Sequence, residues 1–224
     1  MATAEAWPDA AGFVLAGGQS SRMGEDKALV RFAGKLLVER ALETLRPAGL
    51  EARIAGARSS LSASAMAGFA PVVEDKTPGS GPLGGICEAL AATTAQWAVF
   101  LPVDLPLIPA TLIEYLLNHA QITGRAVTLV SVNGFAQSFP VVLDRAVLPA
   151  LERELGAGRG GCFAGFQAAS EQLNQAMTIV AVETVVQAGR VEHPDGLPAA
   201  RWFFNVNRPA DLRRAETYGW AFIA

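Results

Sequence analysis

One stretch near the start of the chain, residues 12–27, limits the possible folds and functions more than any other. It begins with a short apolar run, 13–16, which is bounded by glycine and is typical of a buried strand. The loop that follows contains three glycines and two basic residues: Gly17, Gly18, Gly24, Arg22 and Lys27. Glycine lets a backbone approach a ligand closely, and successive N–H groups in such a turn form an anion site. The stretch predicts a phosphate-binding loop, although an ordinary strand-to-helix turn with a solvated basic end fits the glycines equally well.

The loop does not match the two common phosphate-binding motifs. A Walker A loop needs lysine directly after its last glycine, whereas Gly24 is followed by Glu25 and Asp26, and the G-x-G-x-x-G fingerprint is also absent. Residues 15–27 match L-A-G-G-x-S-x-R-M-G-x-D-K without a gap. This form is typical of the molybdenum cofactor guanylyltransferases, within the molybdopterin nucleotidyltransferases that load GTP or CTP onto the molybdenum cofactor. The chain therefore resembles this family.

Composition agrees with a globular protein. The chain has 224 residues, of which 51% are hydrophobic, and we expect one domain over 1–224 with residues 1–11 as a flexible extension. The net charge of −3 gives no basic surface for a nucleic acid. The N-terminus lacks a signal peptide pattern, and no apolar run reaches the roughly 18 residues of a membrane span. Two separated cysteines without a C-x-x-C motif are typical of a reduced, cytoplasmic protein.

Strand and helix patterns alternate over the first half of the chain, which predicts parallel βαβ units. Asn133-Gly134 is a type I′ turn signal, so residues 141–143 are expected to return antiparallel. The other expected strands are 51–55, 70–73, 98–101, 125–131 and 177–182. The expected helices are 37–45, 60–67, one from the 77–85 loop through 86–90, 110–119, 146–155 and one from Pro209. Residues 156–165 are glycine-dense and have no clear assignment, and residues 189–200 are expected to form a loop. The resemblance adds that the whole is a three-layer, Rossmann-like nucleotidyltransferase fold of class α/β, with a mainly parallel sheet.

Ligands of such sheets bind at the carboxyl ends of the strands. Asp104 follows an apolar strand between Pro102 and Pro106 and suits Mg²⁺, although on its own it fits a simple turn cap better. Asp75 also ends an expected strand, and on its own this position is typical of a solvated carboxylate. In the family, the aspartate of the D-x-P motif binds the metal, so the resemblance implies that Asp104 is a metal ligand. It also implies that Asp75 contacts the nucleotide.

The remaining site residues follow the same two lines of argument. Lys27 is a point charge suited to a phosphate tail, and Arg22 could grip phosphate oxygens bidentately. The loop 77–85 opens a helix and matches the family's G-P-L-x-G segment with Gly81 and Pro82. Asn205 and Asn207 match its N-x-N motif and are predicted to share a face, or else serve the turn before Pro209. The nucleotide-binding set is Leu15, Ala16, Gly17, Gly18, Lys27, Asp75 and Asp104. The catalytic set is Lys27, Asp104 and Arg22, and the acceptor- or phosphate-orienting set is Gly81, Pro82, Asn205 and Asn207.

The resemblance implies transfer of GMP from GTP to the phosphate of molybdopterin with Mg²⁺ as cofactor, and contacts that extend to molybdoenzyme-maturation proteins. A phosphate acceptor is already largely ionised at neutral pH, so no strong general base is required. Gly17 is expected to leave room for guanine. The alternatives are cytidylyl transfer to the same cofactor, transfer to another phosphorylated acceptor, or a non-catalytic nucleotide sensor. Residues 54–56 lack the asparagine that many guanylyltransferases carry there, and the 189–200 loop is longer than usual.

Overall fold

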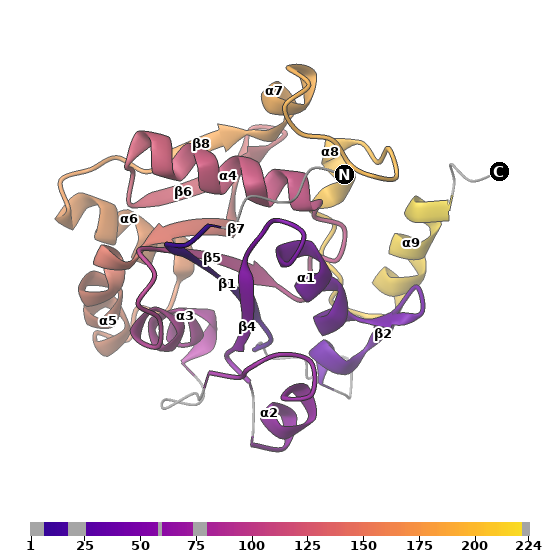
Figure 1. Ribbon diagram of the computed structural model, residues 1–224, viewed down its shortest axis with the longest axis horizontal. Helices are drawn as coiled ribbons and strands as arrows, with labels where there is room; N and C mark the ends of the chain where they lie inside the picture. Colours follow the sequence, from indigo (N-terminus) through magenta and orange to yellow (C-terminus); the bar gives the residue numbers. More distant parts are fainter. Residues whose placement is uncertain (1–6, 18–25, 58–59, 74–79, 221–224) are drawn as a thin grey trace.

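The computed structural model describes residues 7–17, 26–57, 60–73 and 80–220, and its centre is a six-stranded sheet (Figure 1). The strand order is β4-β1-β5-β7-β6-β8. The strands are β1 (Ala10–Leu15), β4 (Glu51–Ala55), β5 (Trp97–Pro102), β6 (Val127–Val132), β7 (Phe135–Asp144) and β8 (Thr178–Ala181). All neighbouring pairs are parallel except the two that β7 makes. The prediction of a mainly parallel sheet with an antiparallel element is confirmed.

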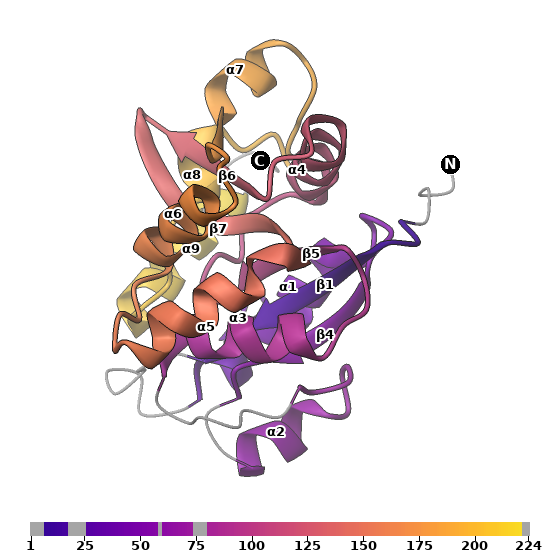
Figure 2. The same cartoon turned by 90° about the vertical axis from the view of Figure 1, so that its left-hand side faces the viewer.

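Helices cover both faces of the sheet. They are α1 (Leu37–Leu45), α2 (Ser60–Met66), α3 (Gly81–Ala91), α4 (Ala110–Thr123), α5 (Leu148–Gly156), α6 (Cys162–Gln172), α7 (Val182–Gln187), α8 (Ala199–Trp202) and α9 (Pro209–Trp220). Figure 2 shows α3, α5 and α6 together. In Figure 1 these three helices lie at the left of the molecule and α9 lies at the right. None of the helices within the described ranges is long and apolar enough to cross a membrane.

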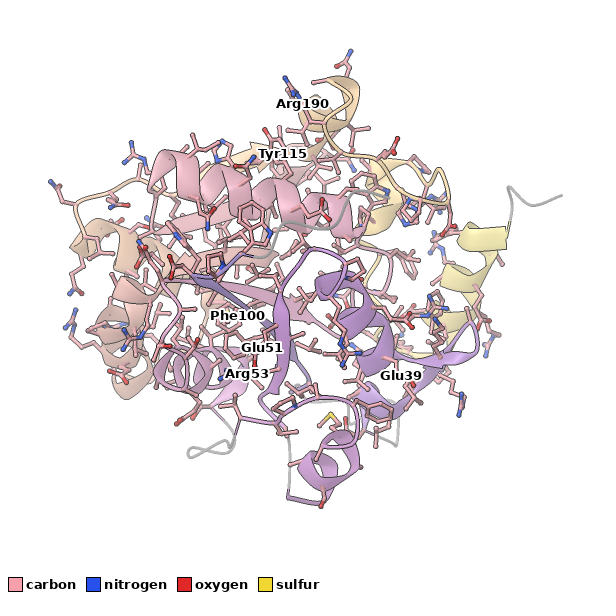
Figure 3. All side chains as sticks on the ribbon, viewed as in Figure 1. Glu39, Glu51, Arg53, Phe100, Tyr115 and Arg190 are labelled. Carbon is pink, nitrogen blue, oxygen red and sulfur yellow. The ribbon has the colours of Figure 1, made fainter. Side chains whose placement is uncertain are left out.

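Strand β1 explains the layering, because its side chains alternate between two cores. Val14 packs into the core under α1 and α4, whereas Phe13 and Leu15 pack into the core under α3, α5 and α6. Phe13 stacks on Phe100 of β5 with ring centroids 5.3 Å apart, and Figure 3 labels Phe100 within the sheet. A strand buried on both faces needs a continuous apolar run, which is the pattern of residues 13–16.

The β6–β7 hairpin was correctly predicted from its turn. Asn133 and Gly134 have φ of 50° and 77°, the left-handed values that a type I′ turn requires. Further along, the pairing shifts between Thr128 and Val130, and residues 138–141 of β7 have no partner on β6. Such bulges re-aim a strand, here close to the carboxyl end of β5.

Several local elements differ from the sequence-based prediction. Residues 70–73 form a single bridge, Ile54 to Val72, because this segment lies at the sheet edge beyond β4. Residues 156–165 contain the end of α5 and the start of α6, and α7 follows β8 directly. The glycines before and within α6, and the β-branched residues of the six-residue α7, hide these helices from periodicity arguments. A small hairpin, β2 (Arg31–Phe32) with β3 (Lys35–Leu36), was also missed.

The expected flexible extension over residues 1–11 is wrong for its described part. Ala10 and Ala11 pair with Trp97 and Ala98 as the first residues of β1. The indole N–H of Trp7 donates to the Ala48 carbonyl at 2.9 Å. The small apolar side chains before Gly12 extend the buried run, which is why the strand begins earlier than predicted.

Candidate active site

The candidate site lies where parallel strands end side by side. Leu15 is in register with Ala55 of β4 and Pro102 of β5, so the loops after β1, β4 and β5 leave the same edge of the sheet. The Val103 N–H donates to the Leu15 carbonyl at 3.1 Å, and the Ala16 N–H donates to the Ala55 carbonyl at 2.9 Å. The loop after β1 is therefore fixed on both sides before it reaches Gly17.

Lys27 is the meeting point of the site. It begins a 3₁₀ helix, η1 (Lys27–Leu29), which is capped by the Asp26 side chain accepting from the Ala28 N–H at 3.1 Å. The Lys27 ammonium donates to Asp104 Oδ2 at 3.0 Å and to Asn207 Oδ1 at 2.7 Å. The lysine side chain is 13% exposed and that of Asp104 is 24% exposed. Three predicted residues that are far apart in the sequence thus converge in a partly desolvated cluster.

The C-terminal segment reaches this cluster through its backbone. The Val206 N–H donates to the Asp104 carbonyl at 2.9 Å, and the Val206 side chain is fully buried. Asn207 follows immediately and faces Lys27. Asn205 is exposed, and its side chain makes no hydrogen bond to any other residue in the described ranges. Of the two predicted asparagines, only Asn207 is joined to the cluster.

Gly17 has a structural reason for lacking a side chain that the sequence did not reveal. A Cβ built there would lie 2.3 Å from the Gly56 carbonyl oxygen, which is far inside contact distance. Gly56 itself has φ of 72°, and a Cβ on Gly85 of α3 would lie 3.1 Å from the Gly56 Cα. The space beside Gly17 is therefore filled by the backbone after β4, which corrects the expectation that it is left free for a base.

The same contact places the start of α3 near the site. Gly81 and Pro82 are exposed in its first turn, and Gly81 has φ of 68°. Within the described residues no side chain caps the N-terminus of this helix, whose first-turn N–H groups have no partner inside the helix itself. Gly85 lies one turn further on, against Gly56. Gly18, Arg22 and Asp75 lie outside the described residues.

The two thiols do not serve the site. Burial raises the pKa of Cys87 to about 12 and the pKa of Cys162 to about 11, so both are protonated at neutral pH. A nucleophilic cysteine needs the opposite shift. Both residues pack with the core under α3 and α6.

Two cavities lie away from the cluster. One of about 440 Å³ is lined by Glu51 and Arg53 of β4, near the end of α3. Another of about 560 Å³ is lined by Tyr115 of α4 and by Arg190. Figure 3 labels these four side chains on two separate parts of the molecule. Neither cavity includes Lys27, Asp104 or Asn207.

Comparison with known proteins decides the family. The model of the MobA-like NTP transferase domain matches residues 12–173, which include most of β1, the glycine loop and Asp104. The chain belongs to the MobA-like NTP transferases. It is therefore a nucleotidyltransferase. The family signature, residues 15–27, ends at Lys27, the residue at the centre of the cluster.

Relatives agree along most of this MobA-like chain. It is 33% identical over 207 residues to a probable molybdenum cofactor guanylyltransferase of Haloferax mediterranei, covering 91% of each chain. It is 34% identical over 179 residues to a molybdenum cofactor guanylyltransferase of Serratia proteamaculans, covering 73% of this chain and 88% of that one. The fold matches molybdopterin-guanine dinucleotide biosynthesis protein A of Archaeoglobus fulgidus with a TM-score of 0.73 at 22% identity, over 92% and 96% of the two chains.

Sequence reasoning missed one residue of this MobA-like site. Asp211 in the first turn of α9 accepts hydrogen bonds from the backbone of Asn207 and Arg208, at 2.9 and 2.8 Å. An acidic residue at the third helical position, shortly after a proline, is a capping signal that was available in the sequence.

Proposed function

We propose that the protein transfers the GMP part of GTP to the phosphate of molybdopterin and releases pyrophosphate. The observation that carries the proposal is the convergence of Lys27, Asp104 and Asn207 at the carboxyl edge of the sheet. Two of these residues, Lys27 and Asp104, lie in the region that matches the family model. The relatives named molybdenum cofactor guanylyltransferase, which cover most of the chain, support the choice of donor and acceptor.

Transfer of GMP to a phosphate acceptor requires little proton transfer by the protein. An oxygen of the acceptor phosphate bonds to the α-phosphorus of GTP, and the bond from that phosphorus to the β-phosphate oxygen breaks. The acceptor phosphate is mostly dianionic at neutral pH, since its second pKa is about 6, so it needs no general base. Positioning and charge stabilisation are what remain for the protein to supply. The Lys27 ammonium, held by two acceptors in a partly buried place, is suited to stabilise charge on the phosphate tail.

We also propose that Asp104 holds Mg²⁺ together with the nucleotide. The donor set fits, because the carboxylate of Asp104 and the amide oxygen of Asn207 are hard oxygen ligands and Asp104 is partly exposed. The described residues contain no group of three or more His, Cys, Asp or Glu that could hold a metal without a substrate. Mg²⁺ commonly takes one or two carboxylates and completes its shell with phosphates and water. When bound, the ion would neutralise phosphate charge.

Guanine recognition is proposed at the backbone between Ala16 and Gly17. The Leu15 carbonyl and the Ala16 N–H already have protein partners, at 3.1 and 2.9 Å. The Ala16 carbonyl and the Gly17 N–H make no hydrogen bond within the described part of the chain. Paired with a base edge, they would reject a base that leaves them unmatched. Among the described residues Leu15, Ala16 and Gly17, this leaves one peptide unit as the candidate base contact.

A direct assay tests the proposal. The purified protein is incubated with molybdopterin, Mg²⁺ and one nucleotide, and both pyrophosphate and the dinucleotide product are measured. We expect product with GTP, at least tenfold less with CTP or ATP, and no pyrophosphate when molybdopterin is omitted. Preference for CTP would overturn the guanylyl assignment while keeping the transferase. Nucleotide binding without pyrophosphate release would indicate a sensor instead.

A further inference from the structure

A single carboxylate oxygen, Asp211 Oδ2, holds the backbone next to the candidate active site by accepting two hydrogen bonds. Asp211 Oδ2 accepts hydrogen bonds from two consecutive N–H groups, those of Asn207 at 2.9 Å and Arg208 at 2.8 Å. Asp211 is the third residue of α9, and such a side chain commonly caps the helix by reaching back to the residue before it. Here the reach goes one residue further, to the asparagine that contacts Lys27.

Asn207 is also fixed from its other side. The preceding residue, Val206, donates its N–H to the Asp104 carbonyl at 2.9 Å and buries its side chain completely. The backbone on either side of Asn207 therefore has a hydrogen-bonded anchor. Because an asparagine side chain has only two rotatable bonds, the position of its amide oxygen follows from the backbone that carries it.

The Asn207 amide oxygen in turn fixes the position of the Lys27 ammonium. Lysine has a flexible four-carbon stem and loses conformational entropy when it is ordered. In this structure its ammonium is held by Asn207 Oδ1 at 2.7 Å and Asp104 Oδ2 at 3.0 Å. If the Asn207 oxygen moved by 1 Å, one of the two acceptors would be lost or misaligned.

We infer that Asp211 is a positioning residue for nucleotidyl transfer: it fixes the Asn207 backbone so that the Asn207 amide holds the Lys27 ammonium ready for the triphosphate. The inference rests on the proposed function for the identity of the triphosphate. Asp211 acts as a hydrogen-bond acceptor in this role, so an uncharged acceptor of the same shape serves it as well.

Helix α9 has further anchors that do not involve Asp211. Glu216 accepts the Ala33 N–H at 3.2 Å, Ala215 is fully buried, and Tyr218 packs edge-on against Phe204 with ring centroids 5.3 Å apart. Loss of the Asp211 carboxylate therefore leaves the helix docked. Glu216 offers a matched control, because Glu216→Gln weakens an anchor of the same helix without touching Asn207.

The first experiment measures GTP binding to the full chain by calorimetry. We expect Asp211→Ala to weaken binding roughly tenfold, since a charge-assisted contact to the phosphate tail is lost, whereas Asp211→Asn and Glu216→Gln bind as the wild type does. In an Asn207→Ala background, adding Asp211→Ala has no further effect on GTP affinity, although its effect on melting temperature persists. An equal loss in that background, or a loss in Asp211→Asn as large as in Asp211→Ala, would overturn the inference.

A second readout does not depend on GTP. Acetylation of lysines by an activated ester is followed by mass spectrometry, with exposed Lys35 in the same chain as the internal reference. We expect the ratio of Lys27 to Lys35 labelling to rise several-fold in Asp211→Ala and to stay unchanged in Glu216→Gln. An unchanged ratio in Asp211→Ala contradicts the positioning role. Failure of the wild type to bind GTP would contradict the proposed function and leave this ratio as the test of Asp211.

Discussion

The ammonium of Lys27 lies 3.0 Å from Asp104 Oδ2, on a lysine side chain that is only 13% exposed. The two residues are 77 positions apart and come from the loops after β1 and β5. Each neutralises the other without a nucleotide. Binding of a triphosphate would offer the lysine a new anionic partner and leave the aspartate for a cation, so each partner can be tested separately.

Asp104→Asn should keep the fold and lose turnover. The amide still accepts the Lys27 hydrogen bond but is a poorer Mg²⁺ ligand, so we expect turnover to fall by about a hundredfold or more. Pyrophosphate release measures it, and the matched control is Glu43→Gln, which removes the exposed ion pair with Lys35. Normal turnover in Asp104→Asn would show that the metal is held elsewhere. Chelation should abolish wild-type activity, and added Mg²⁺ should restore it.

Lys27→Met should weaken binding of GTP about ten- to a hundredfold while changing binding of guanosine little, because one charge-assisted contact is worth roughly 1.5–3 kcal/mol. Titration calorimetry with both ligands gives the comparison. Lys35→Met, which alters an exposed lysine, serves as the control. Should both ligands lose affinity equally, Lys27 would be acting through folding and not through the phosphates.

The same variant should change metal binding in the protein without nucleotide. In the wild type the ammonium occupies one oxygen of Asp104, and a divalent cation beside it would be repelled. We therefore expect Lys27→Met to bind Mn²⁺ several-fold more tightly than the wild type, as followed by electron paramagnetic resonance. Weaker Mn²⁺ binding in the variant would show that the lysine does not compete with a cation for Asp104.

Gly17→Ala should destabilise the protein and impair GTP binding together. Its Cβ would lie 2.3 Å from the Gly56 carbonyl, so two backbone segments must separate. Overpacking of this kind costs about 1–3 kcal/mol. Thermal unfolding measures the loss, and Gly156→Ala, which has open space around it, is the control. A stable Gly17→Ala protein that only changes its choice of base would return the glycine to its predicted role beside guanine.

From the raised pKa values of Cys87, which is buried, and Cys162, which is partly buried, we predict that stability depends on pH. Their pKa values of about 12 for Cys87 and about 11 for Cys162 lie above the value of about 8.5 expected in an unfolded chain. The unfolded state therefore loses protons first, so this contribution to stability is complete below pH 8.5 and is lost as pH rises toward 11 and 12. Urea titrations between pH 8 and 10.5 should show a smaller decline in Cys162→Ala than in the wild type. An identical decline would contradict the prediction.

The sequence predicted the parts of the fold that local chemistry determines. The run around Phe13 and the pair Asn133-Gly134 specify a buried strand and a hairpin without help from distant residues. Helix α6, which begins in a glycine-dense stretch, and the six-residue helix α7 were missed because their helicity depends on packing. Residues 70–73 look like a strand but lie where the sheet offers one edge only.

The sequence was sufficient to predict which residues form the candidate site, but not the hydrogen bonds that join them. Lys27, Asp104 and Asn207 could be placed at one edge from strand ends and the family motif. Their hydrogen bonds, and the role of Asp211, depend on how the chain returns after β8, which no short motif specifies. The contact of Gly17 with Gly56 likewise joins two loops that are adjacent only in the folded sheet.

The bond between Lys27 and Asn207 spans 180 residues, and this span has a consequence for biosynthesis. During translation, β1, β4 and β5 emerge long before Asn207 does. A nascent chain that ends before residue 207 can bring Lys27 to Asp104 but lacks the second acceptor of the ammonium. The order of synthesis thus withholds the complete Lys27 cluster until residue 207 has been synthesised. Closing so long a loop is also slow, because distant contacts form only after much entropy has been lost.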